Sequence, residues 1–516
     1  MDVTIDTIRV DVGPLTPAEV VAVARAGRQV ELTSEAVAAM RESRAVIDGL
    51  AHDSQPHYGV STGFGALANQ PIPPDLRKQL QRSLIRSHAA GSGPEVEREV
   101  VRALMLLRLS TLATGRTGIR PQTAQVYARL LNAGITPVVH EYGSLGCSGD
   151  LAPLAHCALA LMGEGRVRDA DGTPLEAGVA LGRAGIVAIE LVEKEGLALI
   201  NGTDGMLGML LLAIEDLREL LVVADIAAAM SVEALMGTDA VFAPELQALR
   251  PQAGQAVAAA NVRALLAGSA IVASHRGPED TRVQDAYSLR CAPAVAGGAR
   301  DTVDHAASVA ARELAAAVDN PVVTRDGRVA SNGNFHGAPL AYVLDFLAIV
   351  AADVASIAER RTDRHLDPAR SHGLPPFLAD SPGVDSGYMI AQYTQAAMVS
   401  QLKRLAVPAS VDSIPSSAMQ EDHVSMGWSA ARKLRLAVDA LRGVLAIELL
   451  TASRSLDLRA PLVAGPATAA VRARIREHVA GPGPDRFLAP DIEAVVRLVR
   501  DGSVRAAAET VVGPLS

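Results

Sequence analysis

The chain has 516 residues, with 48 Lys+Arg against 57 Asp+Glu and a formal net charge of −9. Its scattered, mildly acidic charge argues against nucleic acid or an anionic membrane surface as partner. Hydrophobic residues make up 49% of the chain but aromatic residues only 3%, which favours closely packed helices over a β-sandwich. Three cysteines cannot form a disulfide framework and fit a reducing compartment. These features predict a mainly α-helical, cytoplasmic protein.

Short helices separated by turns are predicted for the N-terminal part. Thr16-Pro17-Ala18-Glu19 has the spacing of a capping box and opens a helix that Gly27 can end. The stretch from Tyr58 to Pro74 is rich in Gly, Pro, Ser and Asn and is expected to be a loop. Residues 169–194 are expected to hold short strands or coil. Further helices are predicted at 34–51, 75–89, 95–113, 121–132 and 150–162.

Longer helices are predicted in the second part, where apolar residues recur at three- and four-residue spacing. Such long, nearly all-round apolar helices belong inside a bundle. These segments are 202–236, 301–318, 339–361, 388–405, 429–455 and 468–478, with one β-hairpin around Asp326-Gly327. We therefore expect a loop-rich N-terminal region (1–200) and a long-helix bundle with C-terminal helices (201–516). The chain starts without a signal-peptide pattern, and no uninterrupted run reaches the ~20 apolar residues of a membrane span.

The most unusual segment of the chain is Gly143-Ser144-Leu145-Gly146-Cys147-Ser148-Gly149-Asp150. The simplest interpretation is a loop before a helix that Asp150 caps. A phosphate-binding loop is disfavoured because no P-loop Lys or dinucleotide fingerprint follows. The spacing also departs from the G-x-S-x-G of a serine hydrolase.

A different chemistry fits the tripeptide Cys147-Ser148-Gly149. In a tightly bent Xaa-Ser-Gly, the Gly amide nitrogen can attack the carbonyl carbon two residues earlier, because Gly has no Cβ to obstruct the approach. Loss of the Ser hydroxyl as water then leaves an exocyclic methylidene group. The product is an electrophile that no ordinary side chain provides.

The surrounding sequence resembles the aromatic amino acid ammonia-lyases, which build a methylidene-imidazolone from Ala-Ser-Gly or a close variant. The segment that carries the signature is GSLGCSGDLAPLAH (143–156), with Cys147 in place of the commoner Ala. Further blocks occur in the family's order: YGVSTGFG (58–65), LIRSHAAG (84–91), EGLALINGT (195–203), QDAYSLRCAP (284–293), DNPVV (319–323), NGNFHG (332–337), LPPFL (374–378) and MQEDHVSMGW (419–428).

The resemblance implies the family's mainly α fold, a large central helical bundle of the fumarase/aspartase-like lyase type with a smaller loop-rich N-terminal region that carries the electrophile. It also implies a homotetramer whose active sites are shared between subunits. The methylidene-imidazolone would form autocatalytically from Cys147, Ser148 and Gly149. Neither a nucleotide nor a catalytic metal is expected, since no H-E-x-x-H or C-x-x-C spacing occurs.

Two residues bear on the substrate. His88 and Glu421 match the pair that holds an imidazole ring in the members of the family that act on histidine. The phenylalanine and tyrosine enzymes usually have Gln at the second position, so Glu421 carries most of the discrimination. The resemblance therefore implies elimination of ammonia from L-histidine to give trans-urocanate, the first step of histidine degradation. A tyrosine or phenylalanine lyase, an aminomutase, and a catalytically inactive helical scaffold stay as alternatives.

The remaining site residues are transferred from the family one at a time. Tyr58 is the first choice of base, with Tyr287 assisting it. Arg290 is expected to bind the substrate carboxylate, which its planar guanidinium suits. Asn201, Gln284 and Phe335 are expected to contact substrate or the ring. His156 and His423 are interpreted as hydrogen-bonded core residues.

Overall fold

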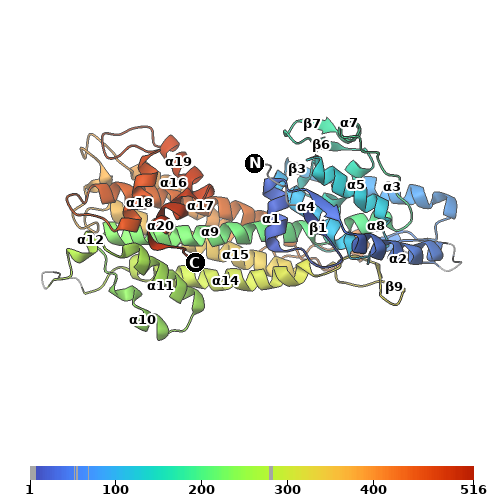
Figure 1. Ribbon diagram of the computed structural model, residues 1–516, viewed down its shortest axis with the longest axis horizontal. Helices are drawn as coiled ribbons and strands as arrows, with labels where there is room; N and C mark the ends of the chain where they lie inside the picture. Colours follow the sequence, from blue (N-terminus) through green and yellow to red (C-terminus); the bar gives the residue numbers. More distant parts are fainter. Residues whose placement is uncertain (1–6, 52, 54–55, 68, 278–279, 281–282) are drawn as a thin grey trace. The chain divides into compact units, whose positions relative to one another are not determined.

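The computed structural model describes every residue except 1–6, 52, 54–55, 68, 278–279 and 281–282, so the N-terminal start considered above lies outside the described residues. The chain is mainly helical, as the composition predicts (Figure 1). It divides into two compact units. Unit 1 comprises Met1–Leu212, Ala307–Asp345 and Pro408–Arg432, and unit 2 comprises Ala213–Ala306, Phe346–Val407 and Lys433–Ser516.

Four long helices contribute residues to both units. They are α9 (Asp204–Ala234), α14 (Ala292–Leu314), α15 (Ala338–Leu366) and α17 (Gly427–Asp457). The periodicity predicts each of them, although α14 begins nine residues before the predicted start at Asp301. Its first two turns contain Gly297 and Gly298, which weaken a helical pattern in the sequence.

Unit 1 holds most of the short elements. Its helices are α1 (Pro17–Ala26), α2 (Ser34–Ala51), α3 (Arg77–His88), α4 (Arg98–Ala113), α5 (Pro121–Asn132), α6 (Leu151–Leu161), α7 (Ala177–Arg183) and α8 (Glu195–Ile200). Its strands are β1 (Ile8–Val10), β2 (Val30–Leu32), β3 (Ser92–Glu95), β4 (Thr136–Pro137), β5 (His140–Tyr142), β6 (Arg166–Arg168), β7 (Pro174–Glu176), β8 (Val322–Val323) and β9 (Val329–Ala330).

The strands of unit 1 form small, separate sheets. β1 pairs parallel with β2, β3 antiparallel with β5, and β4, β6 and β7 form one antiparallel sheet. The predicted hairpin around Asp326-Gly327 is confirmed as the pair β8–β9. The β1–β2 pair escapes prediction because three residues are too few for an alternating pattern to stand out.

The first helix illustrates how local sequence sets the boundaries. The Thr16 side chain accepts a hydrogen bond from the Glu19 backbone amide, and the Glu19 carboxylate accepts one from the Thr16 amide at 2.7 Å. Gly27 ends α1 in the left-handed conformation, with φ 67°. The capping box and the glycine stop are both confirmed.

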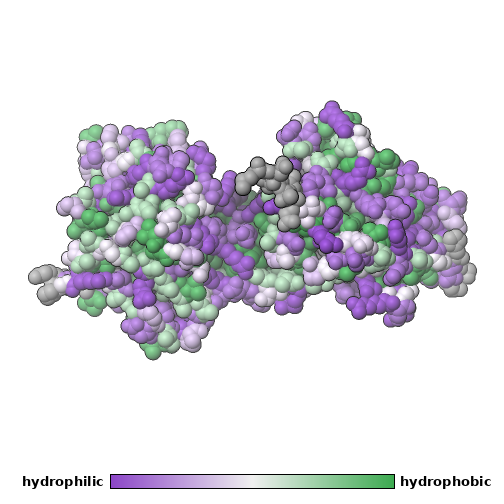
Figure 2. Space-filling model, in the orientation of Figure 1, coloured by the Kyte–Doolittle hydropathy of each residue, from purple (hydrophilic) through white to green (hydrophobic). Residues whose placement is uncertain are grey.

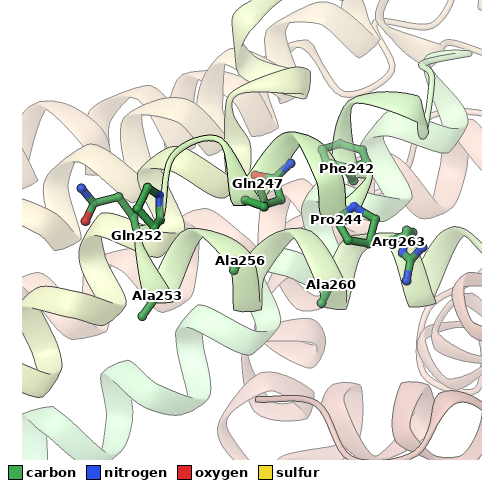
Figure 3. A pocket seen from close by; sticks show the side chains of 10 residues that line it. Phe242, Pro244, Gln247, Gln252, Ala253, Ala256, Ala260 and Arg263 are labelled. Atoms are coloured by element: carbon green, nitrogen blue, oxygen red, sulfur yellow. The ribbon is translucent and has the colours of Figure 1, made fainter.

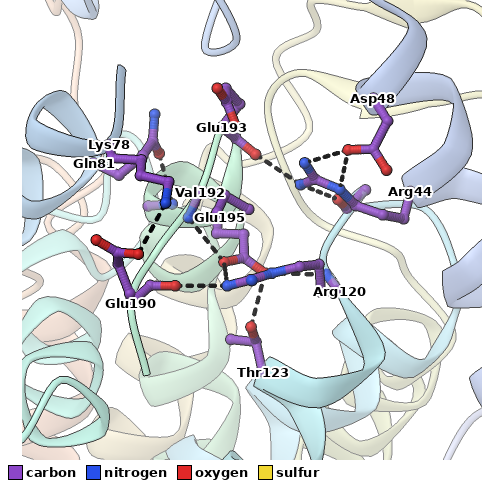
Figure 4. A network of polar contacts seen from close by, with 12 residues as sticks. Arg44, Asp48, Lys78, Gln81, Arg120, Thr123, Glu190, Val192, Glu193 and Glu195 are labelled. Atoms are coloured by element: carbon purple, nitrogen blue, oxygen red, sulfur yellow. Dashed lines mark hydrogen bonds and ion pairs between the residues drawn. The ribbon is translucent and has the colours of Figure 1, made fainter. Parts of the chain in front are cut away.

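A buried carboxylate anchors the start of α8. Glu195 has no solvent exposure and binds the Arg120 guanidinium at 2.7 and 3.0 Å, together with the Thr123 hydroxyl at 2.7 Å (Figure 4). It also accepts from the Val192 amide at 3.1 Å. Because α8 is only six residues long, this fixed start determines where Asn201, the residue that follows α8, is placed.

Among its described residues, unit 2 contains helices and loops and no named β-strand. Besides its parts of the long helices it contains α10 (Pro244–Ala248), α11 (Ala253–Leu266), α12 (Ala270–Ala273), α13 (Tyr287–Arg290), α16 (Met389–Leu405), α18 (Pro466–Arg476), α19 (Ala489–Arg500) and α20 (Ser503–Val512). The short 3₁₀ turns of the two units are η1 (Gly65–Leu67), η2 (Pro74–Leu76), η3 (Ala240–Phe242), η4 (Pro376–Leu378) and η5 (Ser417–Met419).

Buried polar pairs join the long helices within unit 2. The Glu448 carboxylate of α17 binds the Arg361 guanidinium of α15 and the Ser231 hydroxyl of α9. Asp225 of α9 binds Arg300 of α14 at 2.6 Å. These bonds join α17 to α15 and α9, and α9 to α14, so all four long helices are linked as the predicted bundle requires.

His365 of α15 is buried in this bundle. Burial, with the nearby charge of Arg459 acting in the same direction, lowers the pKa of His365 from 6.5 to about 3. Between these values the unfolded chain binds a proton that the folded chain does not, so stability contributed by neutral His365 is lost as the pH falls. Relative to His365→Gln, we expect the wild-type free energy of unfolding to drop by ~2 kcal/mol between pH 6.5 and pH 5.

Urea unfolding of the two proteins at several pH values measures this difference. The same pH dependence in the wild type and in His365→Gln would contradict it.

One helix among the described residues, α15, is long and apolar enough to cross a membrane by length and composition. Of its apolar window 61% is buried, which is the pattern of a core helix. Asp345, which interrupts the apolar run in the sequence, is buried and accepts a hydrogen bond from the Ser410 amide at 2.8 Å.

Candidate active site

The tripeptide Cys147-Ser148-Gly149 lies in the turn between β5 and α6 of unit 1. Gly149 has a φ of 74°, and its Cβ position would be 2.1 Å from the Gly202 carbonyl oxygen. Only glycine fits at this close approach between two backbones. The Asp150 amide donates to the same Gly202 oxygen at 2.7 Å, which holds the bent tripeptide against the segment that follows α8.

Asp150 does not cap the helix that follows it, contrary to the simplest sequence interpretation. Its Oδ2 instead accepts the backbone amides of Gly205 and Met206, both at 2.9 Å, at the start of α9. Its Oδ1 accepts from the Ser144 hydroxyl at 2.9 Å. Burial raises the pKa of Asp150 to about 7. This carboxyl therefore ties the tripeptide loop to the N-terminus of a helix more than fifty residues away in sequence, which only the tertiary fold can arrange.

Glu421 meets the tripeptide from a distant part of the chain, also within unit 1. Its Oε1 accepts from the Ser148 hydroxyl at 3.1 Å, and its Oε2 accepts from the Cys147 thiol at 3.4 Å. The Ser416 hydroxyl donates to Oε2 at 2.9 Å. The residue predicted to select the substrate and the serine predicted to form the electrophile are thus in direct contact.

An unusual turn brings Glu421 to this position. Ser417, Ala418 and Met419 are three consecutive non-glycine residues with φ between 52° and 69°. Each left-handed residue costs ~1–2 kcal/mol. The turn is closed by the Ser416 amide, which donates to the Glu421 carbonyl at 3.0 Å. Strain of this kind persists where the surrounding fold imposes it, and it clusters at functional sites.

These side chains open onto a cavity of ≈ 500 Å³ within unit 1. Five predicted residues line it: Tyr58, Cys147, Ser148, Phe335 and Glu421. Asn320, a weaker candidate from the sequence, also lines it. The cavity further contains residues that the sequence did not place in the site, namely Gly65, Ser331, Asn332, His336, Gln420, Asp422 and His423. All of them except Ser331 lie inside the matching blocks, so membership of a block was the available signal.

His423 corrects one prediction. It is exposed and lines the cavity, where its ring stacks on that of His336 with centroids 5.4 Å apart. It is therefore not a core residue. His156, in contrast, accepts a hydrogen bond from the Gly91 amide at 3.1 Å, and burial lowers its pKa to about 4.

His88, the last residue of α3, is half-buried. Burial lowers its pKa below the ordinary value, while a contact with the Leu84 carbonyl and the charge of Glu421 act in the opposite direction. The imidazole is therefore neutral near pH 7. It lies within electrostatic range of Glu421, but it is not among the residues that line the cavity.

The Tyr58 hydroxyl accepts a hydrogen bond from the Gly65 amide at 3.2 Å, which folds the loop back on itself. Asn201 is buried next to Gly202, which contacts the tripeptide, and its backbone carbonyl accepts from the Arg108 guanidinium at 2.7 Å. The structure does not place Asn201 among the residues that line the cavity.

Three predicted residues belong to unit 2 and are described only within it. Gln284 is exposed, and Tyr287 is 72% exposed at the start of α13. The Arg290 guanidinium lies over the Tyr287 ring, 4.7 Å from its centroid, and Arg290 Nε donates to the Asp285 carbonyl at 2.9 Å. None of these three residues is among those that line the cavity around Ser148.

A second cavity lies within unit 2, on the helices α10 and α11 (Figure 3). Its described lining consists mainly of alanine and proline side chains with Phe242, and Arg263 lies at one end. Its lining residues include no carboxylate, imidazole or thiol. The cavity with Ser148 and Glu421 is therefore the candidate active site.

Comparison with known proteins defines the class. The sequence profile described as "Aromatic amino acid lyase" matches residues 15–477. The chain therefore belongs to the aromatic amino acid lyase family. A relative from Streptomyces avermitilis named "Histidine ammonia-lyase" is 65% identical over 511 residues, which cover 99% of this chain and 100% of that protein.

Solved structures agree with the fold. Histidine ammonia-lyase from Trypanosoma cruzi is similar with a TM-score of 0.90 and 39% identity, covering 98% of this chain and 95% of that one. Tyrosine aminomutase from Streptomyces globisporus is similar with a TM-score of 0.93 and 37% identity, covering 98% and 99%. The predicted helical lyase fold is confirmed.

Proposed function

We propose that the chain is a histidine ammonia-lyase that eliminates ammonia from L-histidine to give trans-urocanate. The observation that carries the proposal is the Glu421 carboxylate, which reaches the Ser148 side chain and acts electrostatically on His88. A carboxylate oxygen can accept the N–H of an imidazole ring, a donor that the side chain of histidine carries and that of phenylalanine does not. The names of the most similar relatives support the same substrate.

The residues present fit the methylidene-imidazolone as electrophile. Gly149 takes the left-handed conformation and close approach that a bent tripeptide needs, and Ser148 faces the cavity. The ring, once formed, supplies an electrophilic carbon to which the substrate's amine adds. A bond between Gly149 N and the Cys147 carbonyl carbon would close the ring with loss of one water. A second water would be lost when Ser148 gives up its hydroxyl.

The chain's own side chains would then bind the substrate and move protons. Glu421 and His88 hold the imidazole, Phe335 packs against the ligand, and Tyr58 takes a β-proton. Arg290 would bind the carboxylate through its planar guanidinium. Asn201 and Gln284 would orient the ligand or the ring, and Tyr287 would assist the base.

The assay that tests this function follows three amino acids separately. Purified protein is incubated with histidine, phenylalanine or tyrosine, and the conjugated acid product is followed by its ultraviolet spectrum. We expect turnover of histidine and almost none of the other two. Preference for tyrosine, or formation of a β-amino acid, would instead assign the chain to the lyases or aminomutases that share its fold, such as the tyrosine aminomutase.

We further propose that the chain forms a homotetramer in the cytoplasm, with each site built from more than one subunit. Tyr342, Phe346 and Ile349 are spaced four and three residues apart on α15, so they share one helix face, and they are 44–50% exposed. Apolar areas also interrupt the polar surface elsewhere (Figure 2). Exposed apolar faces of this kind mark interaction surfaces.

A complementation experiment tests the shared site. The chains Ser148→Ala and Arg290→Ala, each inactive alone, are co-expressed with different tags and the mixed assemblies purified. If one subunit supplies Ser148 and another Arg290, some mixed sites are intact and activity returns. Light scattering should give a particle of four 53.6-kDa chains. Mixed assemblies without activity, or an active monomer, would contradict the shared site.

A further inference from the structure

The two oxygens of the Glu421 carboxylate have different partners. Oε2 accepts two hydrogen bonds, from the Cys147 thiol at 3.4 Å and from the Ser416 hydroxyl at 2.9 Å. Among the described residues, the one side-chain donor to Oε1 is the Ser148 hydroxyl at 3.1 Å. Two donors from separate segments prevent rotation of the carboxylate, because rotation would break both hydrogen bonds.

Dehydration of Ser148 changes the hydrogen bonding of only one of these two oxygens. When Ser148 loses its hydroxyl as water, Oε1 loses its donor while Oε2 keeps both of its donors. A carboxylate oxygen in a partly buried cavity requires a hydrogen bond, since leaving it unpaired is costly. The vacated Oε1 would therefore present a fixed acceptor to an incoming N–H group.

Cys147 is suited to hold the carboxylate in this way. It is 6% exposed, and burial together with the Glu421 charge raises the pKa of the thiol to about 11, so it stays a protonated donor at neutral pH. An Ala at this position, the commoner residue in the family, has no donor to offer. The side chain thus adds a contact that the ring chemistry itself does not need.

We infer that the Cys147 thiol is a positioning residue: with Ser416 it fixes Glu421 so that Oε1, vacated by dehydration of Ser148, accepts the imidazole N–H of the substrate. This inference rests on the proposed function, because it takes the substrate to be histidine. It assigns a role to the Cys147 side chain, beyond that of the carbonyl that enters the ring.

Binding without turnover tests the inference. In Ser148→Ala both the hydroxyl and the ring are missing, so Oε1 is free and calorimetry reports the Kd of L-histidine directly. Adding Cys147→Ala should weaken histidine binding by ~3- to 10-fold, the range for losing one modest hydrogen bond to a charged group. Adding Cys147→Ser instead should restore binding to within ~2-fold, since a hydroxyl is also a donor.

Two controls separate positioning from packing. The side chain of L-phenylalanine has no N–H for Oε1, so its weak binding should not change with Cys147→Ala. Cys157→Ala removes a thiol that is fully buried in α6, away from Glu421, and should leave the Kd of histidine unchanged.

The inference is overturned if Cys147→Ala leaves histidine binding within ~2-fold, if it weakens phenylalanine binding equally, or if Cys147→Ser fails to restore binding. Tighter binding of phenylalanine or tyrosine than of histidine in Ser148→Ala itself would reject the proposed substrate. Failure of the proposed function is thus distinguishable from failure of the inference, because the first result does not depend on Cys147.

Discussion

Ser148→Ala is expected to abolish ammonia release from histidine, with a loss of ~10³-fold or more, because the electrophilic carbon derives from the Ser148 side chain. By intact-mass analysis the wild-type chain should be lighter than its sequence mass by two waters, and Ser148→Ala should not show this deficit. The geometry supports this expectation, since Gly149 approaches Gly202 too closely for any Cβ.

Cys147→Ala is the matched control for the mass measurement. Only the carbonyl of residue 147 enters the ring, so this variant should keep the deficit of two waters and stay active, with weaker histidine binding. A wild-type chain of full mass that is fully active would refute the electrophile.

Glu421→Gln is expected to lower kcat/KM for histidine by about ten-fold or more, taking ~1.4 kcal/mol as the minimum for one charged hydrogen bond. The amide keeps the shape but removes the negative charge. When its oxygen keeps the donors Cys147 and Ser416, its NH2 group takes the position of Oε1, where an acceptor for the imidazole N–H is needed. The deficit of two waters should persist, because Glu421 belongs to the substrate pocket.

Steady-state kinetics on histidine and phenylalanine measure this effect. A site built around polar contacts rejects an analogue that lacks them by up to ~10⁴–10⁵. The wild type should therefore have a much higher kcat/KM for histidine than for phenylalanine. Glu421→Gln should lower this ratio, because kcat/KM for histidine falls. If Glu421→Gln keeps the wild-type kcat/KM for histidine, Glu421 does not bind the substrate.

Local features were predictable because neighbouring residues determine them. The capping box of Thr16 and Glu19, the stop at Gly27 and the hairpin at Asp326-Gly327 each depend on a few consecutive residues, and each is confirmed. The long helices were predictable because their apolar periodicity is sustained over many turns. The proposed boundary at residue 200 stays a prediction.

The sequence by itself also determined the family blocks and predicted the chemistry of the tripeptide among them, because both depend on residue identity and order. Only the tertiary structure decided that Glu421 reaches Ser148, since the two are 273 residues apart and meet through three strained left-handed residues. The tertiary structure also showed that Asp150 accepts hydrogen bonds at the start of α9 and does not cap the helix that it precedes. His423, expected in the core, lines the cavity. Contacts between residues so far apart in sequence depend on how whole helices pack. Local residue patterns do not predict which distant segments pack together.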